Sequence, residues 1–213
     1  ADGSLNDFKL RYYDVRFSNI CNFSCRSCGS LFSSAWHADE KRAGWNPQHP
    51  VIMYAGKHKN DMWEQMQEHI PHLDQIYFAG GEPLIMEEHN RILKLLIEKG
   101  NTKVRLIYNT NLNELRYKKE SVLDLWDHFP TVCVAASLDD MGARAELIRS
   151  GTVWAEVEQN SLQLLHHQFI STIINFVLTS INVLNFVDFA DWIYANNIDK
   201  GITISPVFRV EYL

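Results

Sequence analysis

The sequence contains little glycine, proline or cysteine, and it has no excess of positive charge. Ten glycines and six prolines in 213 residues exclude a collagen-like or low-complexity chain. Lys and Arg number 20 against 26 Asp and Glu, and the resulting net charge of -6 disfavours nucleic acid as the main partner, because an acidic surface repels phosphate. No uninterrupted apolar stretch is long enough to cross a bilayer, and no charged-then-apolar leader opens the chain. We therefore expect a cytoplasmic protein that does not enter a membrane.

The few cysteines are unevenly distributed. Cys21, Cys25 and Cys28 have the spacing C-x3-C-x2-C, whereas Cys133 lies alone in an apolar stretch. This clustering is unlike the spread pairs of a disulfide framework, so a reducing compartment fits better. Three thiols at this spacing can converge on one metal centre. Because three thiolates leave one iron of a four-iron, four-sulfur cluster without a protein ligand, such a site can bind and activate a small molecule.

Zinc is an alternative metal for the same three cysteines. His37 or another histidine would then supply the fourth ligand, since structural zinc usually closes its own set of four. Under this alternative the chain is a non-catalytic zinc-binding interaction module. The cysteine spacing by itself leaves both interpretations open.

Short apolar stretches alternate with amphipathic ones along the chain. Strands are predicted at 10–17, 75–79, 104–108, 132–136, 172–177 and 201–205. Helices are predicted at 31–36, 61–69 (closed by Pro71), 84–99 (stopped by Gly100), 121–128 (capped by Ser121), 154–167 and 186–195, with a long irregular connection at 44–56.

This alternation of strands and helices predicts a parallel sheet with right-handed crossovers. Six units are too few to close an eight-unit barrel. The expected fold class is therefore α/β, a partial (βα)6 TIM-like barrel with a curved parallel sheet and outer helices. We assign residues 1–213 to a single domain. Clear terminal signals are lacking, which is also compatible with the core or a fragment of a longer protein.

Polar and glycine-containing segments follow the predicted strands, where a parallel barrel binds its ligand. Gly80-Gly81-Glu82-Pro83 follows the second strand, and its two glycines permit a positive φ and a close approach of the main chain to a ligand. Standing alone, this segment would also be explained as an ordinary turn. Glu82 faces the site or stabilises the start of the following helix through its charge.

The cysteine motif after the first strand and the Gly80-Gly81-Glu82-Pro83 motif after the second resemble the signature elements of the radical S-adenosylmethionine superfamily. Residues 77–89 and 108–112 resemble the members with a twitch or SPASM-type accessory region, although that region is not evident here. The resemblance implies that Cys21, Cys25 and Cys28 hold a 4Fe-4S cluster. It further implies that S-adenosyl-L-methionine binds the open iron and is reductively cleaved to a 5'-deoxyadenosyl radical, which abstracts hydrogen from the substrate.

The resemblance also implies which residues bind S-adenosylmethionine. The glycine segment would meet the amino group of its methionine moiety, Arg149 its carboxylate, and Ser137 its ribose or carboxylate. The full set of cofactor-binding candidates is Gly80, Gly81, Glu82, Pro83, Asn109, Asn111, Ser137, Asp139, Arg149, Thr179 and Asn182. There are two alternatives to cofactor binding. Arg149 would lie on a solvated helix face, and Asn109 and Asn111 would serve turn formation.

One position departs from the family pattern. Many members have an aromatic residue before the third cysteine, whereas this chain has Ser27, so adenine contacts would come from the main chain, from Phe23 or from later loops. Cys133 is expected to be a buried structural thiol. The resemblance implies a peptide or protein substrate and an electron-donor protein such as a flavodoxin or ferredoxin. A small metabolite or nucleoside substrate is the alternative.

Overall fold

The computed structural model describes residues 8–165, 167, 169–198 and 201–206. Its centre is a six-stranded sheet in which all neighbouring strands are parallel and the strand order follows the chain. The strands are β1 (Tyr12–Val15), β3 (Gln75–Phe78), β4 (Arg105–Thr110), β7 (Val132–Ser137), β9 (Ile170–Leu178) and β10 (Ile202–Pro206). All six predicted strands are therefore present, and the predicted parallel sheet is confirmed.

Seven helices and four short strands complete the description of these residues. The helices are α1 (Trp36–Arg42), α2 (Asp61–Met66), α3 (Glu87–Glu98), α4 (Val122–Trp126), α5 (Gly142–Ile148), α6 (Trp154–Leu165) and α7 (Phe186–Ala195), with 3-10 turns η1 (Ile70–His72), η2 (Pro83–Ile85) and η3 (Val183–Asn185). Strand β2 (Ser24–Cys25) pairs with β8 (Arg149–Ser150), and β5 (Arg116–Tyr117) pairs with β6 (Glu120–Ser121). None of these helices combines the length and apolar character that crossing a bilayer requires.

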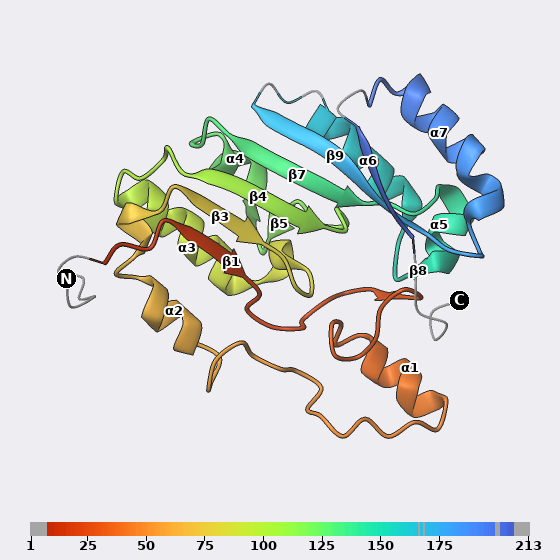
Figure 1. Cartoon of the computed structure of the whole chain (residues 1–213), viewed down its shortest axis with the longest axis horizontal. Coiled ribbons are helices and arrows are strands. Elements are labelled where there is room, and N and C mark those ends of the chain that lie inside the picture. Colours follow the sequence, from red (N-terminus) through yellow and green to blue (C-terminus); the bar gives the residue numbers. More distant parts are fainter. Residues whose placement is uncertain (1–7, 166, 168, 199–200, 207–213) are drawn as a thin grey trace, which may run out of the picture.

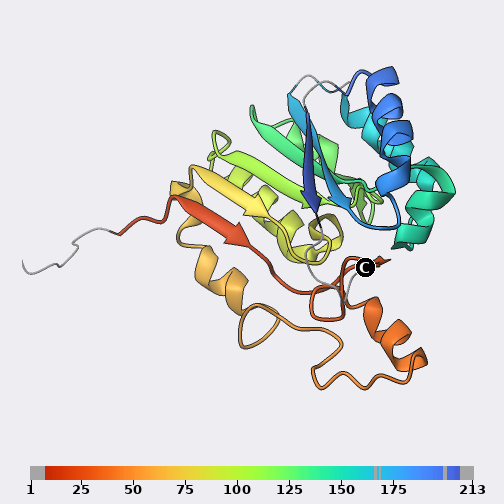
Figure 2. The same cartoon turned by 45° about the vertical axis from the view of Figure 1, so that its right-hand side comes forward.

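The arrangement of the layers places the carboxyl ends of the strands together. In Figures 1 and 2 the sheet twists along its length, α3, α4 and α6 lie against one face, and the segment that carries α1 and α2 passes below the β1 edge. The arrowheads in Figure 1 point toward the side on which β2 and α1 lie. The loops after the strands therefore meet the segment that follows β1.

The two faces of the sheet differ in burial because side chains alternate along each strand. The face toward the helices carries fully buried side chains, such as Phe78 and Tyr108, which pack with Ile92 and Leu93 of α3. The opposite face carries half-buried polar side chains, among them Asn109 of β4 and Asn175 of β9. This second face is the inner wall of the partial barrel.

The first predicted helix is misplaced. Residues 31–35 form turns, and α1 begins only at Trp36. Ser33 Oγ donates to the carbonyl oxygen of Phe23 at 2.5 Å and also accepts from the main-chain N–H of Ala35, 3.3 Å away. Serine side chains that bond the main chain in this way compete with helix formation.

Other boundaries also differ from the expectations. Helix α2 ends at Met66 instead of 69, and Pro71 lies within η1 instead of closing that helix. Helix α5 and the short strand β8 were not predicted at all. Ser121 does cap α4 as predicted, because its Oγ accepts the N–H of Leu123 at 3.2 Å.

The expected burial of Cys133 is wrong. Its side chain is half-buried on β7, on the same face as the half-buried polar residues, and its Sγ lies 3.6 Å from Nη2 of Arg105. The strand itself was predicted correctly. The error lies in assuming that side chains on both faces of this strand are buried.

Candidate active site

One cavity at the carboxyl edge of the sheet brings most of the predicted site residues together. It has a volume of about 260 Å3. Its predicted lining residues are Cys21, Cys25, Cys28, Gly80, Gly81, Glu82, Asn109, Asn111, Ser137 and Arg149. These residues come from the cysteine loop, from the ends of β3, β4 and β7, and from β8. The parallel topology of the sheet therefore brings together the motifs that the sequence indicated.

The loop that carries the cysteines is fixed by main-chain hydrogen bonds. Cys25 lies on β2 and pairs with Arg149 on β8, and the N–H of Cys28 donates to the carbonyl oxygen of Cys25 at 3.0 Å. The indole N–H of Trp36 donates to that same oxygen at 2.8 Å. The neighbouring N–H of Arg26 bonds the carbonyl oxygen of Ile148, 2.8 Å away. The β2–β8 pairing thus holds the cysteine loop against the end of α5.

The three thiols are free and line the same cavity, but they do not form a ready-made metal site. Across the described residues, no three Cys, His, Asp or Glu side chains lie together as ligands for a metal ion. Burial raises the pKa of Cys21 to about 12, and it also raises the pKa of Cys25 and Cys28. The thiols are therefore protonated when no cation is present, and binding a metal centre requires them to release protons and come together.

The glycine loop packs directly against the cysteine loop. Gly80 and Gly81 have φ values of 77° and 55°, and a side chain at Gly81 would collide with the carbonyl oxygen of Ile20. The N–H of Glu82 donates to that oxygen at 2.8 Å. Glycine at position 81 is therefore required by the left-handed backbone and by the close approach of two loops.

Glu82 fulfils both roles expected for it, because it lines the cavity and its side chain caps the start of η2. Its side chain is buried, and its carboxylate accepts hydrogen bonds from the hydroxyl of Thr110 (2.7 Å), the N–H of Asn111 (2.7 Å) and the N–H of Leu84 (3.1 Å). Burial raises the pKa of Glu82 to about 7, against the lowering effect of these hydrogen bonds. The residue braces the end of β3 against the end of β4 and caps η2.

Arg149 is a buried cation at the back of the cavity. Its Nε lies 2.7 Å from Oδ2 of Asp139, and its Nη1 lies 3.6 Å from Sγ of Cys25. Only 12% of the Arg149 side chain and none of the Asp139 side chain is exposed. The solvated helix face considered for Arg149 is therefore wrong. Asp139 does not line the cavity, because it lies behind Arg149 and accepts the N–H of Val177 at 2.8 Å.

The remaining predicted residues lie outside the cavity lining. Asn182 Oδ1 accepts the N–H of Thr179 at 2.8 Å, and its Nδ2 donates to the carbonyl oxygens of Asp139 and Val177, each 2.9 Å away. Pro83 is in η2 and is buried. These contacts give Thr179 and Asn182 a role in connecting β9 to the loop after β7. That they bind S-adenosylmethionine stays a prediction.

The two asparagines after β4 make tertiary contacts as well as turns. Asn111 Nδ2 donates to Oδ1 of Asn22 in the cysteine loop at 2.8 Å, and Asn109 Oδ1 accepts from Nδ2 of Asn175 at 3.2 Å. Sequence reasoning missed five further lining residues, which are Arg16, Phe32, Ser33, Ala79 and Thr110. Arg16 follows β1 directly, so its position just before the cysteine loop was the available signal.

Within the part of the chain that the structure describes, no histidine completes a zinc site at the cysteines. His37 is absent from the cavity lining, and its ring packs edge-on against that of His49 with 6.2 Å between centroids. The zinc alternative therefore gains no fourth ligand from His37.

A scan against protein-family models and a search of curated proteins both give no match. Solved structures do match. The structure of anSMEcpe with bound AdoMet aligns with a TM-score of 0.64 at 16% identity over 92% of this chain and 51% of that one. SuiB from Streptococcus suis, bound to the precursor peptide SuiA, aligns with a TM-score of 0.58 at 15% identity over 93% of this chain and 39% of that one.

The chain has the fold of radical S-adenosylmethionine enzymes. The partial barrel predicted from the sequence is thereby confirmed, and so is the resemblance to this superfamily at the level of the fold. The structure of anSMEcpe with bound AdoMet and the Kp18Cys peptide aligns comparably, with a TM-score of 0.62 at 15% identity over 92% of this chain and 51% of that one. The chain spans about half the length of anSMEcpe and less of SuiB.

Proposed function

We propose that this protein is a radical S-adenosylmethionine enzyme whose Cys21, Cys25 and Cys28 hold a 4Fe-4S cluster. The observation that carries the proposal is that three thiols, a glycine loop and a buried arginine line one cavity at the carboxyl edge of the sheet. The fold is shared with anSMEcpe, which binds AdoMet. A three-thiolate donor set fits this cluster, because it leaves one iron open to a small molecule.

When bound, the cluster supplies the electron that cleaves S-adenosylmethionine to methionine and a 5'-deoxyadenosyl radical, which takes a hydrogen atom from the substrate. The chain contributes binding and orientation. Arg149, held by Asp139, offers a fixed guanidinium for the methionine carboxylate, and the main chain at Gly80 and Gly81 approaches the amino group. Ser137, Asn109 and Asn111 supply hydroxyl and amide groups for the ribose.

The proposed substrate is a peptide or protein. This part rests on two structural neighbours, since anSMEcpe is known with the Kp18Cys peptide and SuiB with the precursor peptide SuiA. The proposed reductant is a small electron-transfer protein such as a flavodoxin or ferredoxin. A small metabolite or nucleoside would use the same chemistry.

Formation of 5'-deoxyadenosine tests the proposal. The chain is purified anaerobically, loaded with iron and sulfide, reduced with dithionite and incubated with S-adenosylmethionine, and the products are separated by chromatography. We expect a brown protein with about four irons per chain that releases 5'-deoxyadenosine. A colourless protein that retains zinc and forms no 5'-deoxyadenosine would support the interaction module instead.

A further inference from the structure

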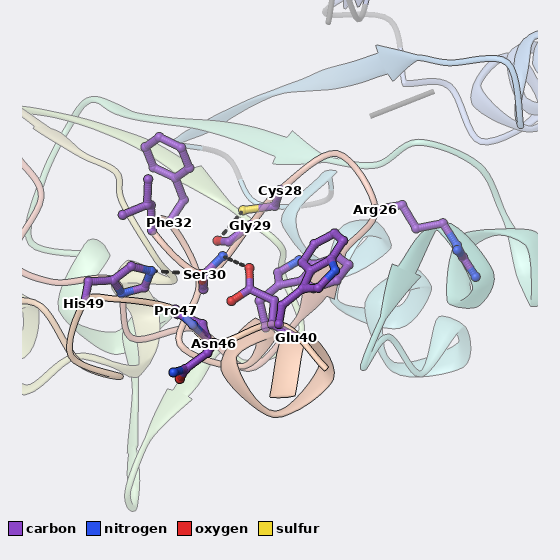
Figure 3. Close-up of a pocket in the computed structure, with 12 residues that line it drawn as sticks. Arg26, Cys28, Gly29, Ser30, Phe32, Glu40, Asn46, Pro47 and His49 are labelled. Carbon is purple, nitrogen blue, oxygen red and sulfur yellow. Dashed lines mark hydrogen bonds between the residues drawn. The ribbon is translucent and has the colours of Figure 1, made fainter. Parts of the chain in front are cut away.

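A second cavity adjoins the first one across Cys28 and Phe32, which line both. It has a volume of about 570 Å3 and is enclosed by the turn after Cys28, by α1 and by the connection that follows α1. Figure 3 shows this cavity, here called the tryptophan pocket, with Glu40 and His49 on opposite sides of Ser30. No part of the predicted S-adenosylmethionine site other than Cys28 lines it.

Aromatic rings form much of the tryptophan pocket. The indole N–H of Trp36 donates to the carbonyl oxygen of Cys25, which holds that ring in place. The main-chain N–H of Trp45 donates to the carbonyl oxygen of Glu40 at 2.9 Å, which fixes the main chain at Trp45. Trp45 and Phe32 are 67% and 65% exposed. An exposed indole ring beside a carboxylate is a favourable environment for an organic cation, because the negative face of the ring attracts positive charge.

Glu40 supplies one negative charge that is incompletely paired. Its Oε1 accepts only a long hydrogen bond, 3.4 Å, from the N–H of Ser30. Its Oε2 is buried and has no hydrogen-bond partner within the described part of the chain. A buried carboxylate oxygen without a donor is unfavourable, and a ligand that donates an N–H to it would remove this cost.

The neighbouring basic side chains do not satisfy Glu40. Arg26 Nε donates to the carbonyl oxygen of Leu147 at 2.8 Å, and Figure 3 shows the guanidinium directed away from Glu40. His49 Nε2 pairs with Ser30 Oγ and its Nδ1 with the carbonyl oxygen of Pro50, each at 3.0 Å. The pocket therefore presents aromatic walls and one carboxylate without a matching cation among the described residues.

We propose that the tryptophan pocket binds an alkylammonium or guanidinium group, with Glu40 as its charge partner and Trp36 and Trp45 as its aromatic walls. Such a group has two sources, a lysine or arginine side chain of a peptide, or a free amine. The peptide source rests on the proposed function. A side chain in this pocket would bring the adjoining residues of a peptide to the cysteine cavity, because Cys28 and Phe32 are common to both.

Ligand-observed NMR tests the proposal on the full chain, purified anaerobically, without S-adenosylmethionine or reductant. The probes are n-butylammonium and its neutral counterpart n-butanol. We expect the cation to bind about tenfold more tightly than the alcohol, and we expect Glu40→Gln to remove this difference. Asp39→Asn, a matched change on the same helix, should leave it unchanged. Equal binding of both probes, or an unchanged preference in Glu40→Gln, would overturn the proposal.

A second variant covers the case in which Glu40→Gln does not fold. Trp45→Leu keeps an apolar side chain at an exposed position and removes the ring, so the preference for n-butylammonium should fall. Tyr194→Leu, at a still more exposed aromatic residue on α7, is the control. If Glu40→Gln and Trp45→Leu both keep the preference for n-butylammonium, the tryptophan pocket is not the source of that preference. Because no turnover is measured, a failure here is distinct from a failure to form 5'-deoxyadenosine.

The two sources are separated by comparing acetyl-Gly-Lys-Gly-amide with n-butylammonium. Tighter binding of the peptide identifies a side chain of a peptide as the occupant, and weaker binding identifies a free amine. Both results require that the acetyl-Gly-Leu-Gly-amide control does not bind, since its binding would contradict recognition of the cation.

Discussion

The main-chain N–H of Asn111 donates a hydrogen bond of 2.7 Å to Oε2 of Glu82, and this bond joins the ends of two neighbouring strands. Glu82→Gln would place an amide N–H2 opposite a main-chain N–H or opposite Thr110. We expect it to lower the free energy of unfolding by about 1–3 kcal/mol, measured by urea denaturation. Glu98→Gln, on an exposed position of α3, should change it by less than about 0.5 kcal/mol. An equal change in the free energy of unfolding for Glu82→Gln and Glu98→Gln would contradict a stabilising role for the hydrogen bonds of Glu82 between β3 and β4.

Gly81 is predicted to set the position of the cysteine loop. Alanine at this position forces a positive φ and pushes against the carbonyl oxygen of Ile20 and Cε of Met86. Gly100→Ala is the control, because Gly100 has a φ of 70° with open space around it. The positive φ should cost both variants about 1–2 kcal/mol of stability, and the collision should make the loss larger in Gly81→Ala. Only Gly81→Ala should lose iron in anaerobic loading. Normal iron content in Gly81→Ala would show that the position of the cysteine loop does not depend on the glycine loop.

Asp139 is predicted to be essential for folding because it is the buried partner of Arg149. Asp139→Asn leaves the guanidinium without its carboxylate and should lower the free energy of unfolding by about 3–5 kcal/mol. Asp188→Asn removes an exposed partner of Arg144 at 3.4 Å and should cost less than about 1 kcal/mol. Similar thermal unfolding of the two variants would mean that Arg149 finds its counter-charge elsewhere.

His89 is predicted to make stability depend on pH. Burial lowers the pKa of His89 from 6.5 to about 3, and its Nε2 lies 3.0 Å from the hydroxyl of Tyr108, which also accepts the indole N–H of Trp126. The unfolded chain therefore binds more protons between these two pKa values. The contribution of His89 is fully present above pH 6.5 and is lost as the pH falls toward 3, by about 1.4 kcal/mol per unit.

Urea denaturation at several pH values tests this dependence. His89→Gln should show a smaller loss of stability than the wild type when the pH is lowered from 6.5. His72→Gln, at an exposed position, should follow the wild type. Parallel pH profiles for the wild type and His89→Gln would contradict the assignment.

Local patterns in the sequence predicted the elements that leave a signature in adjacent residues. The six strands, the cap at Ser121 and helix α7 were found because alternation, a capping side chain and helical spacing are properties of adjacent residues. The convergence of the cysteine and glycine motifs on one edge was also predictable, since parallel strands place their carboxyl ends together.

Contacts between distant segments were not predictable in this way. The β2–β8 pairing joins residues more than a hundred positions apart, and it turns Arg149 from a surface candidate into a buried cation paired with Asp139. Helix α1 was misplaced because Ser33 bonds the carbonyl oxygen of Phe23 across ten residues. The tryptophan pocket likewise depends on the fold of residues 44–56, which sequence patterns identified only as an irregular connection.

The central claim is that the three cysteines of the loop act as one iron-sulfur site for S-adenosylmethionine. The most direct measurement is 5'-deoxyadenosine release by four single serine variants of the reduced, iron-loaded protein. We predict that Cys133→Ser retains release like the wild type, whereas Cys21→Ser, Cys25→Ser and Cys28→Ser each abolish it. Release that persists in any loop variant, or that is absent from the wild type, would contradict the account.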